Sequence, residues 1–124
     1  MTFLNVANAV DAMGENMEAL DLFESTMKDN ERTLAKWHPQ TLNCCMNIAI
    51  THHIGLRSFA RAEELYEKIL VGRTLQFGFD HENTRKCVEN YEMCLKKSRD
   101  YGRLAKLNKE FPWLLEPGRT ILRD

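Results

Sequence analysis

The chain has 124 residues, with 17 Lys or Arg and 18 Asp or Glu, and its formal net charge is −1 at pH 7. This length predicts one domain and excludes a two-domain enzyme. The near balance of charge excludes a global field that would recruit nucleic acid or an anionic membrane, so any electrostatic recognition requires a local patch.

The expected location follows from three further features. The opening stretch MTFLNVANAVDAMGENMEAL lacks the basic start and unbroken apolar run of a secretory signal. No apolar run reaches the roughly 18 residues that span a bilayer. Two of the four cysteines are adjacent, which disfavours a disulfide framework and favours reduced thiols. We therefore expect an intracellular protein, cytoplasmic by default, without membrane insertion.

Apolar residues recur at helical spacing along the whole chain, and β-branched alternation is scarce. In chain order, we predict helices at about 2–13, 16–34, 40–54, 58–76, 83–98 and 101–111. Pro112 ends the last helix, and 112–124 is predicted to be a Pro-containing tail. The predicted fold class is all-α.

The predicted helices differ in their apolar faces. Helix 2–13 is apolar and lacks an opening turn, which suggests a missing neighbour in a longer chain or a partner subunit. Helix 40–54 is apolar over most of its circumference, so we expect it to be covered on more than one side. Helix 58–76 repeats helix 16–34 in phase, at a distance of 43 residues. The matching residues are Ala19, Leu22, Phe23 and Met27 with Ala62, Leu65, Tyr66 and Leu70.

A second echo joins HPQTLNCCMN at 38–47 to HENTRKCVEN at 81–90. The repeated His, Thr and Cys are typical of linkers and helix starts, where polar side chains satisfy free N–H groups. Their spacing lacks the C-x-x-C or H-x-x-x-H pairs of a zinc site, and no phosphate loop or nucleophile motif is present. We expect no enzyme, cofactor or metal, with a zinc protein or thiol enzyme as a third alternative.

The segments LNVANAVDAMGENMEALDLFESTM and MNIAITHHIGLRSFARAEELYEKIL, with the linkers HPQT and DHENT, resemble tetratricopeptide repeats of the long, kinesin-light-chain-like type. The resemblance covers about residues 4–111. It implies an α-α superhelix of about three helix pairs, at 2–37, 38–80 and 81–111, so that 1–111 form the repeat domain.

In that family, the first helix of each pair lines a concave face, and a repeated Asn binds the backbone of an extended peptide. The matching positions here are Asn5, Asn47 and Asn90, with Asn43, Ile50, Lys86 and Lys97 on the same predicted faces. The lysines would favour an acidic segment. The alternative, that these asparagines stabilise neighbouring repeats, stays open.

Two features concern the C-terminal end. Arg85, Glu89, Glu92 and Lys96 replace apolar or neutral residues of the preceding pair, and we interpret them as the polar outer side of a terminal cap. Trp113 in the tail is expected to fold back over the final helix as a lid, with an anchor inserted into a partner as the alternative.

The resulting functional hypothesis is a non-catalytic protein–protein interaction module, an adaptor or structural subunit of a larger intracellular assembly. Its expected partner is a protein or extended peptide segment. The alternative is an RNA-binding helical-repeat protein of the pentatricopeptide type. The spacing of 42 to 43 residues and the net charge disfavour nucleic acid.

Overall fold

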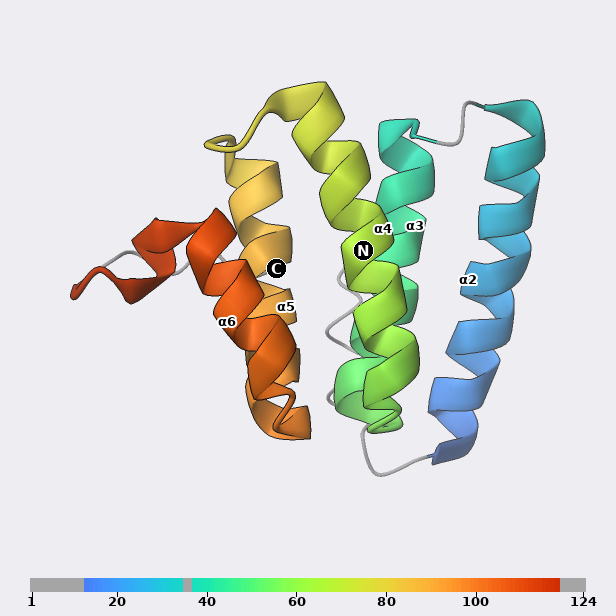
Figure 1. Cartoon of the computed structure of the whole chain (residues 1–124). Helices are drawn as coiled ribbons and strands as arrows, with labels where there is room; N and C mark the ends of the chain where they lie inside the picture. Colours follow the sequence, from blue (N-terminus) through green and yellow to red (C-terminus); the bar gives the residue numbers. More distant parts are fainter. Residues whose placement is uncertain (1–12, 35–36, 119–124) are drawn as a thin grey trace.

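The computed structural model describes residues 13–34 and 37–118 of the chain (Figure 1). Within these ranges the chain forms five α-helices and no strand. They are α2 (Met13–Thr33), α3 (Pro39–Ile50), α4 (Phe59–Phe77), α5 (Glu82–Ser98) and α6 (Tyr101–Glu110). A π-helical turn, Thr51–Gly55, continues α3, and a 3-10 turn, Pro112–Leu115, follows α6. The all-α prediction is confirmed.

The predicted helix positions agree closely with those observed from residue 16 onward. The main difference is at 40–54, where the α-helix ends at Ile50 and the backbone continues as the π-helical turn. The helix α2 starts at Met13, so Gly14 lies in its first turn rather than in a linker. The predicted helix 2–13 and Asn5 lie outside the described residues, apart from Met13.

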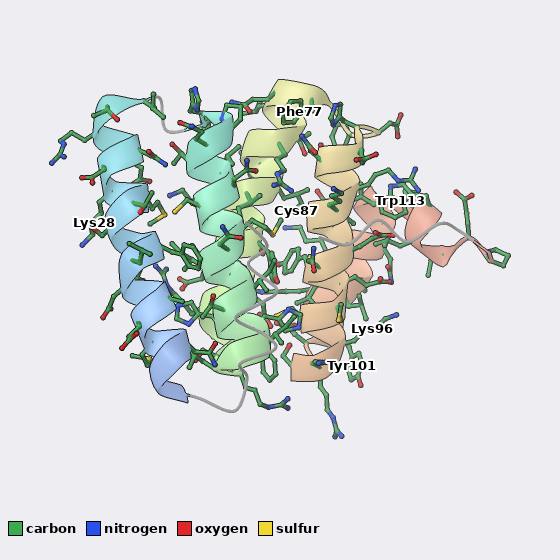
Figure 2. All side chains as sticks on the ribbon, turned by 180° about the vertical axis from the view of Figure 1, so that it is seen from behind. Lys28, Phe77, Cys87, Lys96, Tyr101 and Trp113 are labelled. Atoms are coloured by element: carbon green, nitrogen blue, oxygen red, sulfur yellow. The ribbon has the colours of Figure 1, made fainter. Side chains whose placement is uncertain are left out.

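Consecutive helices pack against one another, α2 on α3, α3 on α4, α4 on α5 and α5 on α6. They run alternately up and down, and α4 and α6 lie in front of α3 and α5 in Figure 1 and behind them in Figure 2. The row places α2 at one end and α6 at the other. The repeat superhelix itself stays a prediction.

The echoed histidines cap two helices in the same way. Nδ1 of His38 accepts a hydrogen bond from the backbone N–H of Gln40 at 3.1 Å, at the start of α3. Nδ1 of His81 accepts from the N–H of Asn83 at 3.0 Å, at the start of α5. Each cap satisfies one of the N–H groups that a helix start leaves without an intrahelical partner. The interpretation of these histidines as helix-start residues is confirmed.

The echoed cysteines also make equivalent contacts. Sγ of Cys44 donates to the carbonyl oxygen of Phe23 at 2.9 Å, and Sγ of Cys87 lies 3.5 Å from the carbonyl oxygen of Tyr66. Because Tyr66 follows Phe23 by 43 residues, the two contacts repeat with the period of the sequence. The echo therefore marks how each of α3 and α5 packs on the helix before it.

The echoed threonines, Thr41 and Thr84, are buried near these helix starts. The hydroxyl of Thr84 donates to the carbonyl oxygen of Gly78 at 2.7 Å and so ties α5 to the end of α4. Thr41 is also fully buried. The expectation that a threonine hydroxyl accepts from a free N–H is wrong for Thr84, because His81 already occupies the cap.

The helix α3 is buried on most sides, as its composition predicted. Its buried residues are Thr41, Leu42, Cys44, Cys45, Met46, Ile48, Ala49 and Ile50. All of them except Thr41 and Leu42 join one core cluster with Tyr66 and Ile69 of α4 and with Val88 and Leu95 of α5. The helix α3 therefore has neighbours on both sides, α2 and α4.

The charged side of α5 does not form the exposed cap that its sequence suggested. Glu89 and Glu92 are 0% and 4% exposed. Glu92 is paired with Lys96 at 3.4 Å, and the Arg85 guanidinium lies 4.2 Å from the centre of the Trp113 ring. Buried charge is retained where it is paired, so these residues belong to the packed structure and the prediction of a polar outer side is wrong for both glutamates.

Two glycines of helices provide a matched test of packing. A Cβ atom at Gly72 of α4 would lie 2.6 Å from the Trp37 ring and 2.9 Å from the Leu42 side chain, whereas one at Gly102 of α6 would meet only Asp100, at 3.9 Å. Overpacking costs about 1–3 kcal/mol and exceeds the gain of about 1 kcal/mol in helix propensity.

We therefore expect Gly72→Ala to lower the free energy of unfolding by about 1 kcal/mol, and Gly102→Ala to raise it by up to about 0.5 kcal/mol. Urea denaturation followed by circular dichroism measures both. Equal effects of the two substitutions would contradict the close packing at Gly72.

Candidate functional site

The residues predicted to bind a partner do not form one continuous surface. Asn43 and Asn47 line a groove between α2 and α3, whereas Lys86, Asn90 and Lys97 belong to α5. We call the first of these the amide groove. It has a volume of about 400 Å³ and is lined by Leu22, Phe23, Thr26, Asn30, Gln40, Asn43, Cys44 and Asn47.

The amide groove brings together more amide side chains than the sequence indicated. Asn30 comes from the last turns of α2, and Gln40 comes from the first turn of α3. Neither belongs to the asparagines repeated at 42 to 43 residues, so periodicity alone could not find them. Only the packing of α2 on α3 places Asn30 opposite α3.

Asn43 is held in place by a buried cation. Arg73, 5% exposed, donates from Nη2 to Oδ1 of Asn43 at 3.2 Å and from Nη1 to the carbonyl oxygen of Asn83 at 2.9 Å. These bonds connect α3, α4 and the start of α5. They occupy the amide oxygen of Asn43, and its amide nitrogen remains a possible donor for a ligand.

Asn47 is half-buried, and its side-chain amide makes no hydrogen bond within the part of the chain that the structure describes. Its backbone carbonyl accepts from the hydroxyl of Thr51 at 2.8 Å, where the α-helix passes into the π-helical turn. The amide therefore has a donor and an acceptor available to a ligand.

The predicted residues of α5 have different surroundings. Asn90 is 3% exposed, and its amide nitrogen donates to the carbonyl oxygen of Lys86 at 2.9 Å, one turn earlier in the same helix. The ammonium of Lys86 lies 3.7 Å from the Glu82 carboxylate, and Lys97 is exposed. Ile50 of α3 is 4% exposed and belongs to the core. Asn90 and Ile50 thus lie inside the fold.

The tail folds back as the lid interpretation predicted. The 3-10 turn packs against α6, and the Trp113 side chain is half-buried against the core, beside Phe111 and over Arg85 of α5 (Figure 2). Leu114 is 5% exposed, whereas Leu115 is 69% exposed. Trp113 therefore covers α5 as well as the final helix.

A second groove, which we call the apolar groove, lies between α4 and α6 and was not predicted. Its volume is about 560 Å³. It is lined by Glu67, Leu70, Val71, Thr74, Leu75, Phe79, Tyr91, Arg103, Lys106, Leu107, Glu110 and Phe111. Val71 and Leu75 are four residues apart on α4, and Phe79 follows the end of the helix. The spacing of Val71 and Leu75 is the signal that could have revealed this second apolar face of α4.

Ionic contacts at one end of the apolar groove position α6. Nη1 of Arg103 lies 3.5 Å from Glu63 and 3.6 Å from Glu67, and the Tyr91 hydroxyl donates to Glu67 at 2.6 Å. The nearby Glu67 carboxylate raises the pKa of Arg103. Burial is the larger cause that raises the pKa of Tyr91, and the hydrogen bond to Glu67 is the second. Arg103 and Tyr91 therefore keep their protons at neutral pH.

The buried thiols are poor nucleophiles. Burial raises the pKa of Cys44 to about 11 and that of Cys94 to about 12. Because the thiolate is the reactive form, both side chains are inert at neutral pH. Within residues 13–34 and 37–118, no group of three His, Cys, Asp or Glu side chains is arranged to hold a metal ion.

Comparison of the chain with protein-family models, curated proteins and solved structures found no match. The tetratricopeptide resemblance therefore depends on the quoted motifs. Among the described helices, none combines the length and apolar character needed to cross a membrane.

The π-helical turn holds a buried titratable group. His53 is 1% exposed, and its Nδ1 lies 3.0 Å from the Tyr66 hydroxyl. Burial, with smaller contributions from Lys97 and Arg57, lowers the pKa of His53 to about 4. The folded protein therefore favours the neutral imidazole.

This shift predicts a loss of stability in acid. Since the pKa is about 6.5 in the unfolded chain and lower in the folded one, the stabilisation is complete above pH 6.5 and decreases as the pH falls toward 4. We expect His53 to account for about 2 kcal/mol of the stability lost between pH 7 and pH 5. Urea denaturation at both pH values should show a smaller loss for His53→Gln, and an equal loss would contradict this role.

Proposed function

We propose that the chain is a non-catalytic protein–protein interaction module, an adaptor or structural subunit of a larger assembly, and that it binds an extended protein segment in the amide groove. The observation that carries the proposal is the convergence of four amide side chains, from Asn30, Gln40, Asn43 and Asn47, in one groove beside the exposed Leu22. The resemblance to tetratricopeptide repeats supports the same class of function.

The spacing of the amides suits a peptide backbone. Asn43 and Asn47 are one helical turn apart, a rise of about 6 Å. In an extended segment, groups on the same side repeat every two residues, or about 6.6 Å. Two successive peptide groups of the ligand can thus face the two asparagines, where the Asn43 amide can donate and the Asn47 amide can both donate and accept, irrespective of the ligand's side chains.

The groove chemistry also distinguishes peptide from nucleic acid. Among the residues that the structure describes, no Lys or Arg side chain lines the amide groove. Single-stranded RNA is usually bound along a positively charged groove with aromatic stacking platforms, and Phe23 is the only aromatic residue among the lining residues. An acidic segment would meet Lys86 and Lys97 only where it extends beyond the groove onto α5.

The proposal predicts that Asn47→Ala weakens peptide binding without unfolding the chain. Peptides selected from a random displayed library on the immobilised chain would be synthesised, and their affinities measured by fluorescence anisotropy. Loss of one or two hydrogen bonds to the backbone should weaken binding by about 5- to 20-fold.

Lys28→Ala is the matched control, because Lys28 is an exposed residue of α2 that does not line the groove (Figure 2). It should bind the selected peptides as the unsubstituted chain does. If no peptide is enriched, or if Asn47→Ala binds equally well with unchanged helicity, the amide groove is not the binding site.

A further inference from the structure

The two ends of the helix row carry opposite charge, although the net charge of the whole chain is −1. The helix α2, at one end, has six acidic and two basic residues, for a net charge of −4. The stretch Glu82–Glu110, which contains α5 and α6 at the other end, has eight basic and five acidic residues, for a net charge of +3. The molecule is therefore polarised along the row (Figure 1).

The acidic end also exposes apolar side chains. Met17 and Leu22 are 47% and 65% exposed, and Glu18 and Asp21 are exposed between them. Met17 and Asp21 are four positions apart, as are Glu18 and Leu22, so the four residues cover adjoining parts of the helix surface over two turns. We call them the acidic patch.

The other end of the row exposes the apolar groove, whose charged lining residues are Arg103 and Lys106 together with Glu67 and Glu110. Val71, Leu75 and Phe79 of the apolar groove are 51%, 70% and 58% exposed. Exposed apolar residues that line the same groove indicate a binding surface, whereas single scattered ones do not. On the α6 side, Lys106 lines the groove and Lys109 is exposed three residues later. Neither lysine makes an ion pair within the described residues.

We propose that the acidic patch of one copy docks in the apolar groove of a second copy, so that the chain assembles head to tail. Met17 and Leu22 would cover Leu75 and Phe79, while Glu18 and Asp21 would face Lys106 and Lys109. Both charged pairs have i, i+3 spacing, so two antiparallel helices can bring them into register. This inference goes beyond the proposed peptide binding, although the acidic patch and the amide groove share Leu22.

The position of the two surfaces sets the form of the assembly. The acidic patch is on α2 and the apolar groove is between α4 and α6, so each copy keeps one surface unoccupied after the other has docked (Figure 1). A contact between two different surfaces is heterologous, and it produces rings or open chains rather than a closed twofold dimer. The average mass should therefore rise continuously with concentration.

Charge reversal of each surface tests the proposal. The α2 variant is Glu18→Lys with Asp21→Lys, and the α6 variant is Lys106→Glu with Lys109→Glu. Each variant alone presents like charges on its two surfaces, whereas an equimolar mixture restores opposite charges. Sedimentation equilibrium at low ionic strength should give masses above 14.5 kDa for the unsubstituted chain and the mixture, and a monomer for each variant.

Glu64→Lys, an exposed position of α4 outside the groove, is the control for a general effect of charge and should associate like the unsubstituted chain. Circular dichroism establishes that each variant is folded. A monomeric unsubstituted chain at about millimolar concentration would overturn the proposal. So would association that persists in either variant, or a mixture that stays monomeric.

Discussion

The packing of Tyr66 is the interaction on which the arrangement of the other helices depends. Its side chain is fully buried in α4, its hydroxyl meets Nδ1 of His53 at the end of α3, and its ring lies 5.8 Å from that of Tyr91 in α5. Its backbone carbonyl oxygen lies 3.5 Å from Sγ of Cys87. One residue thus joins α4 to both of the helices packed against it. Its buried ring contributes apolar area to the core that α3, α4 and α5 share.

Arg73 makes the corresponding connection nearer the C-terminal end of α4. Its guanidinium bonds to Asn43 of α3 and to the backbone of Asn83 at the start of α5. A guanidinium has five donors in a fixed plane, so one buried guanidinium can donate to two acceptors from different helices at the same time. Together with Tyr66, Arg73 holds both α3 and α5 against α4, and it also orients one amide of the proposed binding groove.

Local sequence signals predicted the helices and the repeat of their contacts. Apolar spacing located α2 to α6 because each helix buries one face, and the echo of His38 at His81 identified two helix starts because capping depends on neighbouring residues alone. Which residues belong to the core and which to the surface was harder to predict from the sequence. Ile50 and Asn90 were assigned to a binding face, yet both are buried, because helix phase cannot show which neighbours cover a side.

The polarity of single residues was the least reliable guide to their burial, for the same physical reason. Glu89 is fully buried although its charge favours solvent, and the apolar Leu75 is 70% exposed. Burial of a charge depends on partners from other segments, as between Arg85 and Trp113, which lie 28 residues apart. Such pairs are formed by the tertiary structure, so the burial of Glu89 and the apolar groove could not be predicted from the sequence.

The two proposed surfaces meet at Leu22, and this shared residue couples them. Leu22 lines the amide groove and also belongs to the acidic patch. A segment bound in the groove and a second copy docked on α2 would each need its apolar side chain, and one side chain cannot be buried by both ligands in full. Binding of either ligand should therefore weaken binding of the other by the same factor, since a coupling free energy is reciprocal. A protein partner would then block the free α2 surface of each copy that it binds and so shorten the head-to-tail chain by mass action, without any change in the fold of the single copy.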